Sequence, residues 1–186
     1  MSSLAPALLL SMPQMVDPNF SRTVVLLCKH NDEGAFGLIV NRPLQTTGTV
    51  TVALDPPVTP SREFQVWLGG PVELERSWIL VGAEPGDPSI VDVPRIRVAS
   101  NLYLSTSPDL LRRILEPNPP ARSRLVVGYA GWGPGQLEAE LNASAWLIGE
   151  AEQDLIFDTP AEEMWEQAIR RLGADPATLQ MSRGVH

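Results

Sequence analysis

Long apolar stretches without alternation predict the central strands of a sheet. Residues 23–29 (TVVLLCK) are β-branched or apolar at nearly every position, which is typical of a strand covered on both faces. Residues 36–41 and 125–130 show a similar pattern. The short connection between the first two stretches contains Gly34 and predicts a hairpin. These three segments should therefore lie deep in the fold.

Shorter patterns predict the remaining strands at the periphery of the sheet. Residues 64–68 alternate between apolar and polar positions, as a half-buried strand does. Residues 46–54 are rich in Thr and Val and predict an extended edge segment, and residues 155–157 predict a short extended piece. Further strands are expected at 7–11, 78–83, 102–105 and 146–149.

Capping residues and helical spacing predict three helices. Ser107 is placed to cap a helix over 108–115, and a glycine-rich turn leads into a short helix over 135–142. Thr159 is placed to cap the next helix, whose apolar stripe consists of Met164, Trp165, Ala168, Ile169 and Leu172. Strands come first and are then mixed with helices, without regular alternation. This order favours an α+β fold with a largely antiparallel sheet.

Length and composition are those of one globular domain that spans residues 1–186. Hydrophobic residues make up 44% of the chain, and charged residues make up 19%. The 18 prolines cluster at 55–60, 84–88 and 116–120, where we expect rigid surface loops. The segments between these loops are too short to bury separate cores.

The charge balance opposes direct binding to nucleic acid. The formal net charge is −8, and the 14 basic residues are scattered, whereas binding to DNA requires clustered cations. We interpret the densest group as a solvated helix face plus a loop; it consists of Arg112, Arg113, Arg122 and Arg124. No basic residue precedes Arg22 and no apolar run could span a bilayer, so we expect a soluble, cytoplasmic protein without membrane contact.

Few residues could support catalysis. The only histidines are His30 and His186, and the second is the terminal residue. No serine lies in a G-x-S-x-G turn, and neither a P-loop nor a G-x-G-x-x-G motif is present. We therefore expect no cofactor, no metal and no catalytic residues, and we interpret the chain as a non-enzymatic protein.

Cys28 is the only cysteine and forms a Cys-x-His pair with His30. Residues i and i+2 of an extended strand project to the same side, so an imidazolium group could lower the pKa of the thiol. Cys28 is therefore a candidate redox residue. The alternative is a small buried apolar residue beside a surface histidine, since free cysteine is among the most buried residue types.

Polar side chains gather at the open end of the predicted hairpin. Arg22, Asn41 and Arg42 flank the two strands there, and two guanidinium groups would suit a carboxylate or a phosphate. The alternative is that they pair with Asp17 or another acid and lock the N-terminal turn.

Two glycine-rich turns extend the anion-binding hypothesis. Gly69 and Gly70 could present backbone donors, and residues 133–135 precede a helix N-terminus. The alternatives are tight turns, with Glu138 and Glu140 occupying the positive end of the helix. We interpret the tryptophans as walls of the core or of a cleft. The candidate ligand-binding residues are thus Arg22, His30, Asn41, Arg42, Gly69, Gly70, Trp132 and Gln136.

Four motifs in order resemble the AlgH/YqgE family of bacterial proteins. They lie at residues 12–43, 68–73, 129–146 (YAGWGPGQLEAELNASAW) and 155–168. The resemblance implies a bent sheet that forms a pseudo-barrel with a few flanking helices, in a cytoplasmic protein. Its relatives have no established molecular function or agreed catalytic residues, and some are labelled transcriptional regulators. Residues 46–63 depart from the family pattern.

Two functions compete. The first is a non-enzymatic regulatory or binding protein with an unknown protein or small-molecule partner. The second is a small-anion or nucleotide-binding protein with a site near Arg22, Arg42 and the glycine-rich turns.

Overall fold

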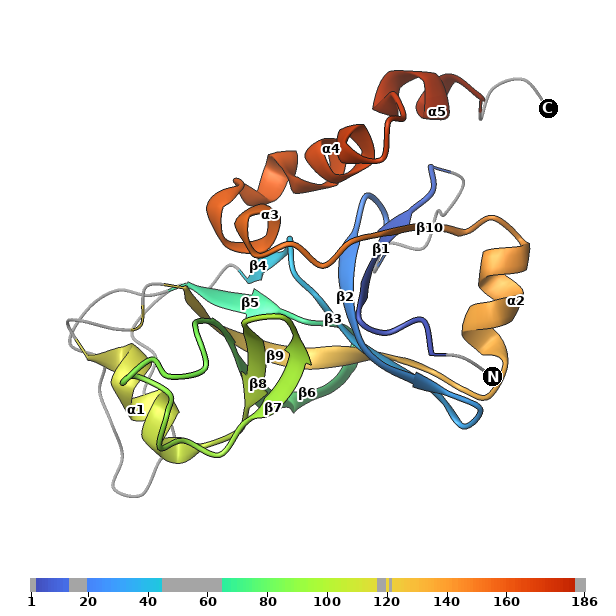
Figure 1. The fold of residues 1–186 in the computed structure, drawn as a ribbon. Coiled ribbons are helices and arrows are strands. Elements are labelled where there is room, and N and C mark those ends of the chain that lie inside the picture. The colour runs from blue at the N-terminus through green and yellow to red at the C-terminus, as the bar shows by residue number, and fades with distance from the viewer. Residues whose placement is uncertain (1–2, 14–19, 45–64, 117–119, 121, 183–186) are drawn as a thin grey trace.

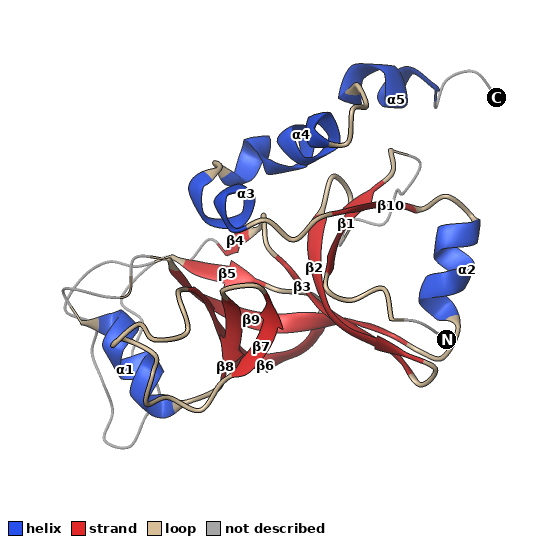
Figure 2. Cartoon of the chain, in the orientation of Figure 1, coloured by secondary structure: helices blue, strands red, loops and turns tan. Residues whose placement is uncertain are grey.

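The ten strands of the described residues form one curled sheet that bends into a half-barrel, with helices on its faces (Figures 1 and 2). The computed structural model describes residues 3–13, 20–44, 65–116, 120 and 122–182. The main path of the sheet has the order β10-β1-β2-β3-β9-β6-β8-β7, while β4 pairs with β5 and β5 pairs with β9. Only the β5–β9 pair is parallel among the described strands. The predicted α+β class with a mostly antiparallel sheet is confirmed.

The elements follow one another without βαβ repetition. The strands are β1 (Ala7–Ser11), β2 (Val24–Asn31), β3 (Gly34–Ile39), β4 (Pro43–Leu44), β5 (Val66–Leu68), β6 (Val72–Gly82), β7 (Ile96–Ala99), β8 (Leu102–Ser105), β9 (Ser123–Trp132) and β10 (Trp146–Gly149). The helices are α1 (Pro108–Leu115), α2 (Gln136–Asn142), α3 (Gln153–Asp158), α4 (Ala161–Arg171) and α5 (Pro176–Ser182). None of the helices in the described ranges is long and apolar enough to cross a membrane.

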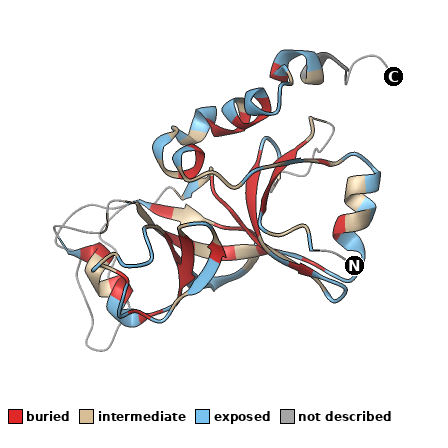
Figure 3. Ribbon diagram, in the orientation of Figure 1, coloured by how far each residue is buried: buried red, intermediate tan, exposed pale blue. Residues whose placement is uncertain are grey.

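The first half of β2, residues 24–27, is buried on both faces, which explains its uninterrupted apolar pattern (Figure 3). Val24 and Leu26 belong to the core cluster beneath α3 and α4. Val25 and Leu27 belong to the cluster beneath α2 on the opposite face. Each of the four residues is fully buried, because each face of the strand has its own helical cover.

Most predicted elements are present, but some differ from the structure. The helix at 108–115 has the predicted bounds, and β6 begins earlier than the predicted strand at 78–83. The prediction of an extended piece at 155–157 is wrong, because this stretch lies in α3, where Leu155 and Ile156 are buried. The sequence patterns did not predict β4, which has two residues, or β7, a short edge strand with two exposed residues. The predicted edge segment at 46–54, Asp17 and His186 lie outside the described residues.

Candidate functional site

Asn41 and Arg42 hold the loop that precedes β2. The Asn41 side chain accepts a hydrogen bond from the Val24 amide at 3.0 Å and donates one to the Arg22 carbonyl at 3.0 Å. The Arg42 guanidinium donates to the Ser21 carbonyl at 2.8 Å. The structure thus brings the predicted polar residues together at the open end of the hairpin. There they serve as donors and acceptors for the chain's own backbone.

Arg22 connects this loop to helix α4. Its guanidinium forms an ion pair with Glu166 at 2.7 Å and lies 4.8 Å from the ring centre of Trp165. The residue has a positive φ of 51°, which is uncommon for a residue with a side chain. An acid therefore neutralises Arg22, as the locking alternative expects. An anion site between the two guanidinium groups stays a prediction.

His30 ties the N-terminal residues to α2. Its Nδ1 accepts a hydrogen bond from the Leu4 amide at 3.1 Å, so its proton lies on Nε2. That Nε2 donates to the Glu138 carboxylate. The bond from His30 lowers the pKa of Glu138 below its ordinary value. The imidazole is buried between these two partners, so it holds the N-terminal residues against α2.

Glu140 is the centre of a polar network that sequence reasoning missed. Its Oε1 accepts hydrogen bonds from the indole N–H of Trp132 at 3.2 Å and of Trp146 at 2.9 Å. Its Oε2 accepts from Gln136 at 3.1 Å, one turn earlier on α2, and Gln136 Oε1 accepts from the Gly133 amide at 3.0 Å. The spacing of Gln136 and Glu140 was the available signal. The network fastens α2 to β9 and β10.

Glu140→Ala should destabilise the protein by about 2–4 kcal/mol, because two largely buried indole donors lose a charged acceptor. Glu140→Gln keeps one carbonyl acceptor and should cost less than the alanine variant. Urea denaturation followed by tryptophan fluorescence would measure both. An alanine variant as stable as the wild type would contradict the proposed role of Glu140.

The Gly69-Gly70 turn is a close crossing of two backbone segments. The Gly69 amide donates to the Val127 carbonyl at 2.7 Å, and the Gly69 carbonyl accepts from Ile39 at 2.7 Å. A Cβ on Gly70 would lie 2.2 Å from the carbonyl carbon and oxygen of Tyr129. Glycine is therefore required for packing here. The Gly69 amide is already bonded within the protein, so it is not available to the predicted anion nest.

Cys28 and His30 do not form the expected pair. The register of β2 and β3 shifts between Leu27 and Lys29, so Cys28 lies at a bulge. Cys28 packs against the cluster beneath α4, whereas His30 contacts Leu4 and α2 at the other face. The expectation that they share one side of the strand is therefore wrong. Burial raises the pKa of the Cys28 thiol to about 12, which opposes thiolate redox chemistry at neutral pH.

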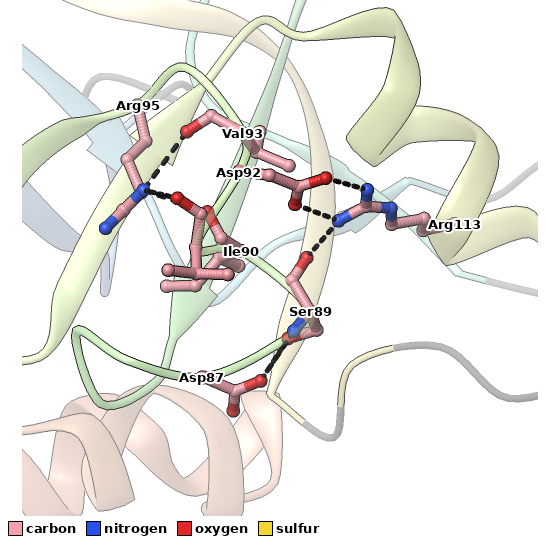
Figure 4. Close-up of polar contacts among 8 residues, drawn as sticks. Asp87, Ser89, Ile90, Asp92, Val93, Arg95 and Arg113 are labelled. Carbon is pink, nitrogen blue, oxygen red and sulfur yellow. Dashed lines mark hydrogen bonds and ion pairs between the residues drawn. The ribbon is translucent and has the colours of Figure 1, made fainter.

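Arg113, which was predicted to belong to a solvated group, holds a loop in place together with Arg95, which was not part of that group (Figure 4). Arg113 donates to both carboxylate oxygens of Asp92, at 2.9 and 3.0 Å, and to the Ser89 carbonyl at 2.7 Å. Arg95 donates to the Ile90 carbonyl at 2.8 Å in the same loop. These bonds fasten the loop before β7 to α1.

Arg124 is partly buried, so the interpretation of the arginine group as a solvated face is wrong for this residue. Its guanidinium lies 3.8 Å from the ring centre of Trp67 and 5.5 Å from that of Phe157, and it donates to the Val40 carbonyl at 2.8 Å. Burial lowers its pKa to about 10. Arg124 thus packs between β9 and its neighbours and does not belong to a solvated face.

A pocket of about 250 Å³ lies between β1, β10, α3 and α4. We call it the β10 pocket; its lining residues are Leu8, Leu10, Gly149, Glu150, Glu152, Leu155, Ala168, Arg171 and Leu172. Four of these residues are buried and form an apolar floor; they are Leu8, Leu10, Leu155 and Ala168. Leu172 is exposed. Charged side chains lie at its rim. No local pattern could predict it, because it combines three distant parts of the chain.

Ion pairs order the rim of the β10 pocket. Arg171 forms an ion pair with Asp154 at 2.8 Å and a second with Glu152. Hydrogen bonds from Arg171 lower the pKa of Asp154 below its ordinary value. Glu150 makes no ion pair with any residue of the described ranges. The pocket therefore combines an apolar interior with an excess of negative charge at its mouth.

Comparisons with known proteins agree on one family. The family described as AlgH-like matches residues 8–177. A UPF0301 protein of Ralstonia nicotianae is 40% identical, with 98% of this chain and 95% of that protein covered. One of Myxococcus xanthus is 40% identical over 100% of both chains.

Two solved structures share the fold. The solution structure of the AlgH protein from Pseudomonas aeruginosa has a TM-score of 0.73 and 35% identity, covering 96% of this chain and 93% of that one. A crystal structure of a protein from Corynebacterium diphtheriae has a TM-score of 0.69 and 23% identity, covering 95% and 90% of the two chains. The curled sheet with its flanking helices is thus the architecture that these proteins have in common.

Proposed function

This chain belongs to the AlgH-like family, and we propose that it is a cytoplasmic regulatory protein that acts by binding a partner protein at the β10 pocket. The observation that carries the proposal is the pocket itself. An apolar floor with a few charged groups at the rim is typical of sites that bind small molecules, and it suits an apolar side chain of a partner protein. The regulatory part of the proposal comes from the family resemblance.

The contacts of the other candidate residues favour this site over the competing one. Arg22 pairs with Glu166, and Arg42 donates to the Ser21 carbonyl, so both guanidinium groups already have partners. An anion at the hairpin end would have to displace such bonds. The net charge of −8 further disfavours phosphate-rich partners, nucleic acid included.

Gly149→Leu should remove partner binding without unfolding the protein. A Cβ at Gly149 meets only the Leu172 side chain, at 3.7 Å, so a leucine would extend into the β10 pocket. Gly86→Leu is the matched control, because a Cβ there meets nothing within 4 Å. Affinity capture from a native bacterial extract should recover the same protein with the wild type and Gly86→Leu, but not with Gly149→Leu. Recovery that is equal for all three would contradict the proposal.

A further inference from the structure

We propose that the partner segment at the β10 pocket is an extended basic peptide, which adds to the sheet as a strand beside β10. On this proposal an apolar side chain of the peptide enters the pocket. The inference rests on the proposed function and names the chemistry of the partner. Strand addition of this kind uses backbone hydrogen bonds for affinity and side-chain pockets for specificity.

The first support is the open edge of β10. This strand is at one end of the sheet and pairs only with β1 among the described strands. The Met12 amide donates to the Ala145 carbonyl at 2.8 Å, which sets the alternation along the pair. The N–H and C=O groups of Trp146 and Ile148 therefore point away from β1. No backbone hydrogen bond to Ile148 from outside the β1–β10 pair occurs within the described ranges.

The second support is the position of the pocket relative to this edge. Gly149 is opposite Leu8 in the register, and both line the β10 pocket on the same face of the sheet. Every second side chain of an added strand would face that side. Ile148 and Leu172, each 43% exposed, flank the edge with apolar surface. One site thus presents both a strand edge and a pocket for its side chains.

The third support is charge, which selects a basic occupant. The mouth of the β10 pocket carries Glu150, Glu152 and neighbouring Asp154, but only Arg171 to balance them. The chain as a whole has a net charge of −8. A lysine or arginine next to the inserted apolar residue would therefore be attracted, whereas an acidic segment would be repelled.

A second copy of the chain is the competing occupant. The opposite edge strand β7 exposes Ile96 to 70%, and Arg95 and Arg97 flank that residue. A β7 edge could in principle pair with β10 of another copy. Such head-to-tail pairing gives a ring if its rotation closes and a filament if it does not, and in both cases the oligomeric state would depend on concentration. We favour a separate partner, because Arg95 is bonded to the carbonyls of its own loop.

The test uses the full chain and a synthetic peptide, acetyl-Lys-Leu-Lys-Leu-Lys-amide, with a Glu-for-Lys peptide as its control. We expect the basic peptide to bind, and to protect the Ile148 amide from hydrogen exchange. Gly149→Leu and Glu150→Lys should each weaken binding about tenfold or more, which is about 1.4 kcal/mol. The matched variants Gly86→Leu and Glu33→Lys should bind as the wild type does.

Backbone methylation identifies strand pairing directly. In a strand, alternate N–H groups point to opposite edges, so only one set of amides can bond to β10. Two peptides would be compared, one N-methylated at the leucines and the other at the lysines. We expect one of them to lose binding and the other to keep it. Equal tolerance of both sets, no protection of Ile148, or equal binding of the acidic peptide would overturn the inference.

The outcomes separate the two proposals. If Gly149→Leu loses the captured partner but no basic peptide binds the wild type, the pocket binds its partner in another way and strand addition is wrong. If neither capture nor peptide binding depends on Gly149, both proposals fail. Self-association that increases with concentration and is lost in Glu150→Lys would assign the edge to a second copy and overturn the separate partner.

Discussion

Gly70→Ala is expected to destabilise the protein by about 4 kcal/mol, because backbone strain and overpacking combine at this position. Gly70 has a φ of 156°, a conformation that residues with a side chain rarely adopt. Its new Cβ would lie 2.2 Å from the Tyr129 carbonyl carbon and oxygen and 2.5 Å from the Ala130 nitrogen. Strand β9 cannot move away easily, since β3, β5 and β6 all pair with it.

Gly86→Ala is the control for this substitution. A Cβ at Gly86 meets nothing within 4 Å, so the same added methyl group should leave stability nearly unchanged. Urea denaturation midpoints of the two variants would measure the difference. Equal midpoints for Gly70→Ala and Gly86→Ala would contradict the close contact between Gly70 and strand β9.

Trp165→Ala should cost about 4–6 kcal/mol, since a large buried ring is lost and a buried acceptor is left unpaired. Trp165 is 2% exposed and lies in the main core cluster between α4 and the sheet. Its indole N–H donates to the Ser11 carbonyl at 2.9 Å, which attaches α4 to β1. Arg22 also packs over the ring. We expect α4 to loosen from the sheet and the β10 pocket to lose a wall.

Trp165→Phe separates the two contributions. Phenylalanine keeps an apolar ring in the core but cannot donate to Ser11, so we expect a loss of about 1–3 kcal/mol. Thermal and urea denaturation, with circular dichroism to confirm folding, would measure both variants. If alanine and phenylalanine cost the same, packing of the ring does not hold α4 on β1.

Local rules predicted the elements whose determinants lie within a few residues. The helix at 108–115 starts directly after Ser107 because Pro108 suits the first helical position, although the Ser107 side chain makes no capping hydrogen bond. The same reasoning failed at 155–157, where three apolar residues are compatible with either a strand or a short helix. The surrounding fold decided for the helix, since α3 buries Leu155 and Ile156 against the core.

Local sequence rules could not predict the contacts between distant segments. Cys28 follows the alternation of Val24 and Leu26, but the side of β2 on which His30 lies depends on a bulge, and a bulge depends on the register with β3. The role of Glu140 depends on two tryptophans that only the folded sheet brings to α2. Asn41 and Arg42 were predicted to gather at the hairpin end, and they do, because both are adjacent in sequence to a strand of that hairpin.

The sequence alone determined the α+β class, the two-sided burial of β2 and most element positions, because apolar periodicity and turn residues act locally. The family came from the resemblance of its four motifs. Only the tertiary structure decided that the singled-out polar residues bond within the protein and that a pocket opens beside β10. Both outcomes depend on which strands become neighbours and in what register. Those choices minimise the free energy of the whole chain, so no short segment carries them.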